Sequence, residues 1–364
     1  MTRRVSRWLL LALLALGAGL PITAPAVGAV GAGAAGADSV APGPLAPLPQ
    51  RTKLVYGVPP GVAFAVYVGL ERGYFDEMSL DIEIEHLTNS AAITPNLVTG
   101  QLDLGHNSAA PGTFNAVARG LPIRAILDTS HYAPGGRSHV IMARQDLFES
   151  GQLQGVEQLR GRRVALGSVP GGLSIDLDLA LRRVGMTVED VESVQIPFVE
   201  QVAALANSSV DAAVTLEPFA MRVAERGAGQ TIQYLNDVYP NHQVAFVMIS
   251  NKLIERPELA RAFASAYLRG ARDYERARQF GQNVEEIAGF LSKYNQQPAQ
   301  LVGSVFRNGG MTAIDPDGRI NVESVQHDIN WYRDRKYVDG DVSASAFVDS
   351  QYADYAVAAL GPFR

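Results

Sequence analysis

The alternation of short β-like runs with helical patterns, from Lys53 onward, most constrains the fold of this chain. Early helical patterns end at Gly73, Gly100 and Gly120, and glycine is the residue that most often terminates a helix. Alternation of this kind is typical of α/β units with a mainly parallel sheet. The predicted strands of this first part cover residues 53–58, 81–87, 102–105 and 123–128.

The same pattern restarts in the middle of the chain. Further strands are predicted at residues 140–144, 163–166, 194–197, 211–215, 231–235 and 244–249, and helices follow at 258–278, 284–294 and 324–335. The 364 residues exceed what one hydrophobic core usually serves. We therefore predict two α/β lobes, joined near residues 131–138 and 236–243. The first lobe consists of residues 52–134 and 241–364, and the second of residues 135–240.

The amino terminus has the features of an export signal. Arg3, Arg4 and Arg7 precede an apolar run, and small residues follow as far as an Ala35-x-Ala37 cleavage pattern. We predict a cleaved signal peptide over residues 1–37 and a disordered, proline-rich leader over residues 38–51. An uncleaved anchor is the alternative, but glycines and a proline interrupt the apolar run before it could span a bilayer. Sec and twin-arginine export both remain open.

Composition excludes several classes of function. The net charge of -6 gives no basic footprint for nucleic acid. The absence of cysteine excludes disulfides, thiol nucleophiles and a lipid anchor on cysteine, so a periplasmic location fits an exported protein. The Gly31-x-Gly33-x-x-Gly36 letters lie in the export segment, and Asp315-Pro316-Asp317-Gly318 is typical of a turn rather than a calcium loop. We expect no enzyme activity, no metal and no cofactor.

Candidate ligand-binding residues follow the predicted strands, because ligands of open α/β sheets bind beyond the carboxyl ends of strands. With two lobes, such loops are expected to face each other across a central cleft. Each residue also has an ordinary reading as a helix cap, a turn or a core side chain. In the first lobe the candidates are Gly61, Phe64, Asn89, Ser90, Asn107, Ser108, His131 and Tyr132. In the second lobe they are Ser168, Gly171, Gly172, Phe198, Glu217 and Phe219.

These candidates have distinct expected roles. The glycines let a ligand approach the backbone, where a helix N-terminus carries about half a positive charge. The Asn and Ser residues would offer exposed amides and hydroxyls, and the aromatic residues would supply apolar walls. His131 and Tyr132, at the first crossover between lobes, would cover the ligand, and Glu217 would accept a hydrogen bond from it. Their coincidence at successive strand ends favours a preorganised polar site over a set of unrelated caps.

Four segments resemble those of a known family of proteins, and they occur in the same order and at the same spacing as in that family. They are Glu71-Arg72-Gly73-Tyr74-Phe75, residues 98–105, residues 159–165 and the stretch from Val210 to Phe219. Between about Val55 and Arg278 the chain resembles the nitrate, sulfonate and taurine receptors of ABC transporters, which also include binders of thiamine-pyrimidine precursors. The resemblance implies a type II periplasmic-binding-protein fold, with two lobes of mixed β-sheets, two crossovers and a central cleft that closes on a ligand.

The resemblance also implies a periplasmic, mainly monomeric receptor that delivers a small molecule to ABC permease and ATPase subunits at the inner membrane. The candidate loops contain no Arg or Lys, so a sulfonate, a carboxylate or a neutral heteroaromatic molecule is favoured over nitrate. An enzyme similar to thiamine-pyrimidine synthase is the alternative on the same fold. Its cofactor is bound to a lysine, but the lysines here, Lys53, Lys252, Lys293 and Lys336, lie outside the candidate loops. Its cysteine-rich motif has no counterpart, because the chain has no cysteine. A periplasmic sensory receptor is a third reading.

Overall fold

The computed structural model describes residues 46–59, 61–87, 92–295 and 297–364. The predicted signal peptide lies outside these residues. The predicted disorder of the leader is wrong at its end, because Leu48 packs against the first hydrophobic core and its amide donates to the carbonyl of Met78. Arg51 also pairs with Asp76 at 2.6 Å. The folded part therefore begins at least four residues before the first strand.

The first sheet has five strands in the order β2-β1-β3-β10-β4. Strands β1 and β2, and β1 and β3, pair in parallel, whereas β10 runs antiparallel to both of its neighbours. The strands are β1 (Thr52–Val58), β2 (Leu80–His86), β3 (Leu104–Ser108), β4 (Arg124–His131) and β10 (Gln243–Ile249). Each predicted strand of this lobe is present, but β3 begins two residues later than predicted and extends to Ser108.

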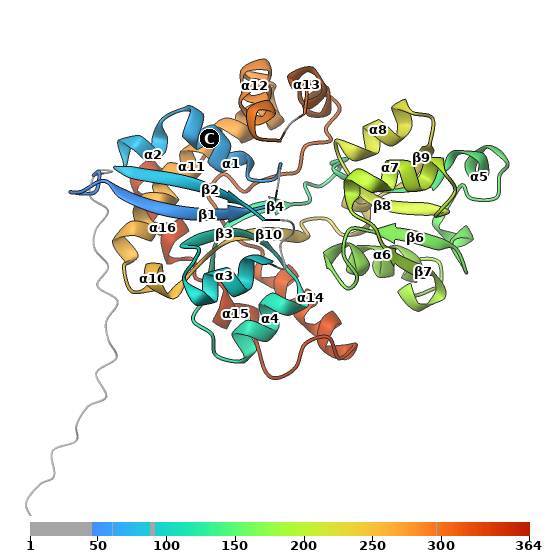
Figure 1. Ribbon diagram of the computed structural model, residues 1–364, viewed down its shortest axis with the longest axis horizontal. Coiled ribbons are helices and arrows are strands. Elements are labelled where there is room, and N and C mark those ends of the chain that lie inside the picture. Colours follow the sequence, from blue (N-terminus) through green and yellow to red (C-terminus); the bar gives the residue numbers. More distant parts are fainter. Residues whose placement is uncertain (1–45, 60, 88–91, 296) are drawn as a thin grey trace, which may run out of the picture. The chain divides into compact units, whose positions relative to one another are not determined.

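Helices cover both faces of the first sheet (Figure 1). One face packs against α1 (Phe64–Glu71), α2 (Tyr74–Glu77), α10 (Asn251–Ile254), α11 (Pro257–Phe280), α12 (Val284–Asn295), α13 (Ala299–Arg307) and α16 (Gln351–Leu360). The other face packs against α3 (Ile93–Thr99), α4 (Pro111–Ala118), α14 (Val322–Asp334) and α15 (Ala344–Phe347). The C-terminal helices therefore pack against the first sheet.

The residues at the two ends of helix α11 explain where this helix begins and ends. Pro257 occupies the first turn, where its missing N–H costs no hydrogen bond, and Glu258 complements the helix dipole there. Gly281 ends the helix in a left-handed conformation at φ 68°. Fifteen of its residues are buried against the first sheet and its neighbours, so this helix anchors the lobe.

The second sheet also has five strands, in the order β7-β6-β8-β5-β9. Strand β6 pairs in parallel with β7 and β8, and β5 is antiparallel to β8 and β9. The strands are β5 (His139–Arg144), β6 (Arg163–Leu166), β7 (Glu192–Gln195), β8 (Ala212–Leu216) and β9 (Gly229–Tyr234). Two mixed sheets covered by helices confirm the predicted α/β class.

Alternating side chains of β5 build two cores, one on each face of this sheet. Ile141 and Ala143 pack on one face, and Val140 and Met142 on the other. The helices are α5 (Gln145–Glu149), α6 (Gly172–Arg182), α7 (Phe198–Ala206), α8 (Phe219–Glu225) and α9 (Leu235–Val238), with 3-10 turns at Val156–Gln158 and Val188–Asp190.

Two connections join the sheets. The chain leaves the first sheet after His131 and enters the second at His139, then returns between Val238 and Gln243. The predicted lobe boundaries fall inside these two connections. Within the described ranges, no helix is both long enough and apolar enough to cross a bilayer.

Candidate functional site

Three loops at one edge of the second sheet bring predicted residues together. Strands β6, β7 and β8 are parallel neighbours, so the segments after them leave the sheet at the same edge. The ring of Phe198 lies so close to Gly167 that a Cβ there would be 2.5 Å from it. The rings of Phe198 and Phe219 stack with their centroids 6.1 Å apart. The two phenylalanines therefore form one aromatic surface at this edge.

The glycine loop before α6 lies at the same edge. Gly171 caps α6 in an extended conformation, and its amide donates to Ser174 Oγ at 3.2 Å. Ser168 is exposed, but its hydroxyl donates to the carbonyl of Pro170 at 2.9 Å. A Cβ on Gly172 would have no atom of the described residues within 4 Å. The backbone at the start of α6 is thus open, whereas the Ser168 proton is already engaged.

Glu217 occupies the third of these loops. Its Oε2 accepts a hydrogen bond from the amide of Met221 at 3.0 Å, so the carboxylate caps the first turn of α8. Burial raises the pKa of Glu217, which the Met221 hydrogen bond partly offsets. The side chain also packs against Gly310, from the loop after α13. None of the described residues donates a hydrogen bond to the other carboxylate oxygen, Oε1, which could therefore accept one from a ligand.

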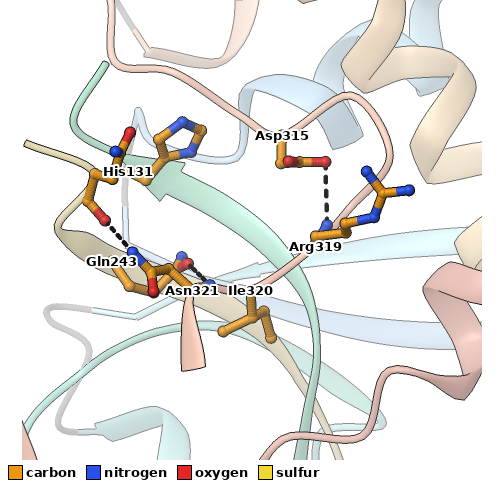
Figure 2. Close-up of a pocket in the computed structure, with 7 residues that line it drawn as sticks. His131, Gln243, Asp315, Arg319, Ile320 and Asn321 are labelled. Carbon is orange, nitrogen blue, oxygen red and sulfur yellow. Dashed lines mark hydrogen bonds between the residues drawn. The ribbon is translucent and has the colours of Figure 1, made fainter. Parts of the chain in front are cut away.

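A polar pocket of about 240 Å³ lies at the corresponding edge of the first sheet (Figure 2). Its residues come from the end of β4, the second connection between the sheets, the start of β10 and the segment between α13 and α14. They are His131, Asn241, Gln243, Asp315, Arg319, Ile320 and Asn321. Figure 2 shows the hydrogen bonds that hold Asn321 on Gln243 and Arg319 on Asp315. The volume suits a small solute or the head group of a larger one, since drug-sized sites begin at about 300 Å³.

The fully buried carboxylate of Asp128 organises one wall of this pocket. Its Oδ2 accepts from His131 Nδ1 at 2.7 Å and from the amide of Asp315 at 2.6 Å. Its Oδ1 accepts from Gln243 Nε2 at 2.6 Å and from the amide of Ser130 at 2.9 Å. Four donors offset the cost of burying this charge. Asp128 therefore fixes β4, β10 and the 312–321 segment to one another.

His131 is held by this carboxylate. Its side chain is 21% exposed, and among the described residues no hydrogen bond reaches its Nε2. Burial lowers the pKa of His131, but the nearby carboxylates of Asp128, Glu275 and Asp315 outweigh burial and raise it above its usual value. The structure thus presents a histidine with one nitrogen fixed and the other free for a ligand.

Two predicted residues have no group free for a ligand. Asn107 was expected to expose its amide, but it is 1% exposed and donates to Thr94 Oγ1 at 2.7 Å and Thr113 Oγ1 at 3.1 Å. Tyr132 was expected to cover a ligand, but it is fully buried and its hydroxyl donates to Asp176 at 2.6 Å. Both expectations of exposure are wrong, because helices pack over these two strand ends.

The other first-lobe candidates have less decisive positions. Phe64 is half-buried and stacks on Tyr274 with centroids 5.4 Å apart. A Cβ on Gly61 would lie 3.2 Å from that of Asn295, and Ser108 is half-buried at the end of β3. Asn89 and Ser90 lie outside the described residues. Contact of these residues with a ligand stays a prediction.

Sequence reasoning missed most of the pocket wall. Asp128 is the one carboxylate in the otherwise uncharged stretch Ala125–His131, and a buried strand with a lone Asp three residues before His131 was the available signal. Asp315 was assigned to a turn, which is correct, since its Oδ1 accepts from the amides of Asp317 and Arg319. That turn also lines the pocket, which its sequence does not reveal.

A second buried cluster connects elements of both sheets. His242, in the second connection, is 1% exposed, with Nδ1 2.7 Å from Asp176 and Nε2 3.0 Å from Asp328. Asp176 lies on α6 and Asp328 on α14, and both are fully buried. Tyr132, from the first connection, bonds the other oxygen of Asp176. One buried ionic cluster therefore joins the two connections to a helix of each lobe.

No group of three or more potential metal-ligating side chains occurs among the residues that the structure describes. The candidate site is thus composed of aromatic rings, open backbone, carboxylates, one histidine and one arginine. This composition can bind and orient a small molecule through hydrogen bonds and apolar contact.

Comparisons with known proteins agree with this description. Residues 62–276 match the family described as NMT1/THI5 like. A protein of Brucella abortus, named only as a binding protein, is 26% identical over 261 residues, which cover 70% of this chain and 76% of that protein.

Two solved structures are similar in fold. The periplasmic aliphatic sulphonate binding protein SsuA of Escherichia coli matches with a TM-score of 0.64 and 18% identity, over 82% of this chain and 92% of that one. The periplasmic nitrate-binding protein NrtA of Synechocystis matches with a TM-score of 0.68 and 16% identity, over 85% and 89%. The chain belongs to the NMT1/THI5-like family and has the fold of the periplasmic binding proteins, which confirms the resemblance predicted from its sequence.

Proposed function

We propose that this protein is the periplasmic solute-binding component of an ABC importer and that it binds a small organic solute. The observation that carries the proposal is that each sheet, taken by itself, places polar and aromatic groups at the edge where its parallel strands end. The named functions of the structural neighbours support it. A cleaved signal peptide, a monomeric state and delivery to permease and ATPase subunits at the inner membrane belong to the same proposal.

An aliphatic or aromatic sulfonate is the ligand class that we favour. The stacked Phe198 and Phe219 offer an apolar surface, and the open start of α6 offers backbone N–H groups to an oxyanion. No Lys or Arg occurs in the loop from Gly167 to Gly172, so recognition there would depend on the backbone. A pyrimidine-like solute would use the same aromatic surface together with Glu217.

The lysines support binding over catalysis. Lys53 pairs with Glu83 and Lys293 with Glu71, while Lys252 donates to the carbonyl of Gly100. These three amines lie on the surface, with side chains about 60% exposed. None is desolvated in a pocket, which is the usual way to lower the pKa of a lysine nucleophile. We therefore do not propose an enzyme of the lysine-bound cofactor type.

A thermal-shift panel of sulfonates, carboxylates, pyrimidines and flavins tests the proposed function. A ligand at about one hundred times its Kd should add about 2.7 kcal/mol to the free energy of unfolding. Calorimetry on the best ligand should then show affinity about three- to tenfold weaker in Phe198→Ala, because the stacked ring is lost. Phe280→Ala, at an exposed position that ends α11, is the matched control and should bind as the wild type does. A panel without any stabilising member would contradict the proposal.

Ligand binding is also expected to compact the protein. Two connections between two sheets can act as a hinge, and a ligand shifts such an equilibrium only through tighter contacts in the closed state. Small-angle scattering with and without a saturating ligand should show a smaller radius of gyration in the complex. An unchanged radius at saturation would show that binding does not require closure.

A further inference from the structure

The polar pocket of the first lobe contains an Asp–His pair whose geometry is fixed by burial. Asp128 is fully buried and takes four hydrogen bonds, one of them from His131 Nδ1 at 2.7 Å. The imidazole therefore cannot rotate without leaving a buried carboxylate short of a donor, which is costly. Because Nδ1 is engaged, Nε2 is the nitrogen that remains for a solute in the pocket.

The charged groups around His131 decide which kind of solute this nitrogen favours. Glu275, from α11, is satisfied by Arg278 at 2.7 Å, by Gln279 and by the amide of Ile314. Asp315 has one oxygen engaged by two amides of its own turn. Arg319 is 62% exposed at the pocket, and its nearest acid, Asp317, lies 3.4 Å away and is shared with Arg272.

Donors of the protein thus occupy Asp128, Glu275 and one oxygen of Asp315, whereas two basic groups have donors to spare among the described residues. His131 contributes Nε2, and Arg319 contributes a guanidinium that, within the part of the chain that the structure describes, is engaged by one long ion pair. Charge-assisted hydrogen bonds from such groups are directed at oxyanions, and an arginine can bind two oxygens at once. The pocket volume of about 240 Å³ admits a head group of that kind.

We propose that Asp128 is a positioning residue that directs His131 Nε2 into the pocket, where His131, with Arg319, binds the oxyanion head group of the solute. This inference rests on the proposed function and deepens it by adding two charged groups of the first lobe to the backbone N–H groups of α6 that are proposed there for the oxyanion. It has a consequence for pH, because only the protonated imidazole donates from Nε2 while Nδ1 also donates to Asp128. The facing groups that govern this protonation are Asp128, Glu275, Asp315 and Arg319. Affinity for an oxyanion is therefore expected to fall as pH rises through the raised pKa of His131.

Histidine side-chain NMR on the purified protein tests the proposal with methanesulfonate as the probe. Inorganic sulfate and acetate are run in parallel to separate sulfonate, inorganic and carboxylate head groups. We expect a saturable shift of the His131 ring resonances, a higher His131 pKa in the complex, and affinity that weakens at least about tenfold as the imidazole loses its proton.

His131→Gln keeps a hydrogen-bond donor but removes the charge. It should bind the probe about tenfold or more weakly at low pH and show no pH dependence. His327→Gln, at a histidine on α14 that is 42% exposed, is the matched control and should retain both affinity and pH profile. Asp128→Asn, if it folds by circular dichroism, should lower the pKa of His131 and weaken binding at neutral pH. If it does not fold, His131→Gln and the wild-type titration decide the question.

The outcomes separate this inference from the proposed function. If a panel solute binds the wild type and His131→Gln equally well and leaves the His131 resonances unchanged, the inference is wrong and the function stands. If neither the probe nor any panel solute binds, both are wrong. A probe that shifts His131 in the wild type and loses affinity in His131→Gln, but not in His327→Gln, supports the assignment.

Discussion

His242→Gln is expected to lower the free energy of unfolding by about 3 to 5 kcal/mol, the usual cost of breaking a buried ion pair from one side. In the wild type the imidazole lies between the buried carboxylates of Asp176 and Asp328, at 2.7 and 3.0 Å. Removing its charge leaves two acids with little compensation in the protein interior. Denaturant unfolding followed by circular dichroism measures the loss.

The pH profile of stability gives a second readout of the same cluster. Burial lowers the pKa of His242, but the two carboxylates raise it to about 10, above the ordinary 6.5. Because the pKa of His242 is higher in the folded state than in the unfolded state, its contribution to the free energy of unfolding is complete below about pH 6.5. This contribution is lost as the pH rises toward 10. We expect the wild type to lose stability over that alkaline range, and His242→Gln to lose this alkaline dependence.

Two other histidines make stability depend on pH in the opposite direction, at acid pH. Burial lowers the pKa of His106 to about 4 and, together with the charge on His242, that of His139 to about 3. Both stay neutral in the fold while the unfolded chain takes up protons, so stability falls as pH drops below about 6.5. The loss of stability at acid pH should persist in His242→Gln. The pKa of His139 should rise in that variant, because the neighbouring charge is gone.

The control for His242 is His86→Gln, at an exposed histidine that ends β2. A surface substitution of this kind is expected to change stability by no more than about 0.5 kcal/mol. If His242→Gln unfolds with the same free energy and the same alkaline profile as the control, then His242 is not the counter-ion of Asp176 and Asp328.

Gly270→Ala is the second substitution with a large expected effect, a loss of about 3 kcal/mol or more. Gly270 lies where α11 crosses α1, and a Cβ there would be 2.2 Å from the carbonyl oxygen of Ala65 and 2.9 Å from the amide of Gly69. Both atoms belong to backbone, so no side chain can turn aside. The two helices would have to separate, and the core between them would lose its packing.

Gly289→Ala is the matched control, since Gly289 lies in α12 and a Cβ there would meet nothing within 4 Å. Alanine at this position should stabilise the protein by about 0.5 to 1 kcal/mol, because it favours the helix and restricts the unfolded chain. Chemical denaturation of both variants gives the comparison. Equal midpoints would show that α1 and α11 can move apart at little cost.

Local patterns in the sequence determined the elements of this fold. Strand β6 has its predicted bounds, and α3 and α4 end near the predicted Gly100 and Gly120, because left-handed caps require little beyond the residue itself. Hydrophobic alternation reports which face of a strand is buried, and this depends on the strand alone. The aromatic surface of Phe198 and Phe219 was also predictable, since it follows from parallel strands ending at one edge.

The tertiary structure decided which polar residues are available. Asn107 lies near the end of β3 and Tyr132 directly after β4, yet their side chains are buried under segments that the strands themselves do not specify. The partners of Asp128 come from positions as far along the chain as Gln243 and Asp315. A polar side chain has the same local signature whether it faces solvent or a buried donor. Only the packing of distant segments determines which of the two it meets, and with it the pocket at His131 and the ion cluster at His242.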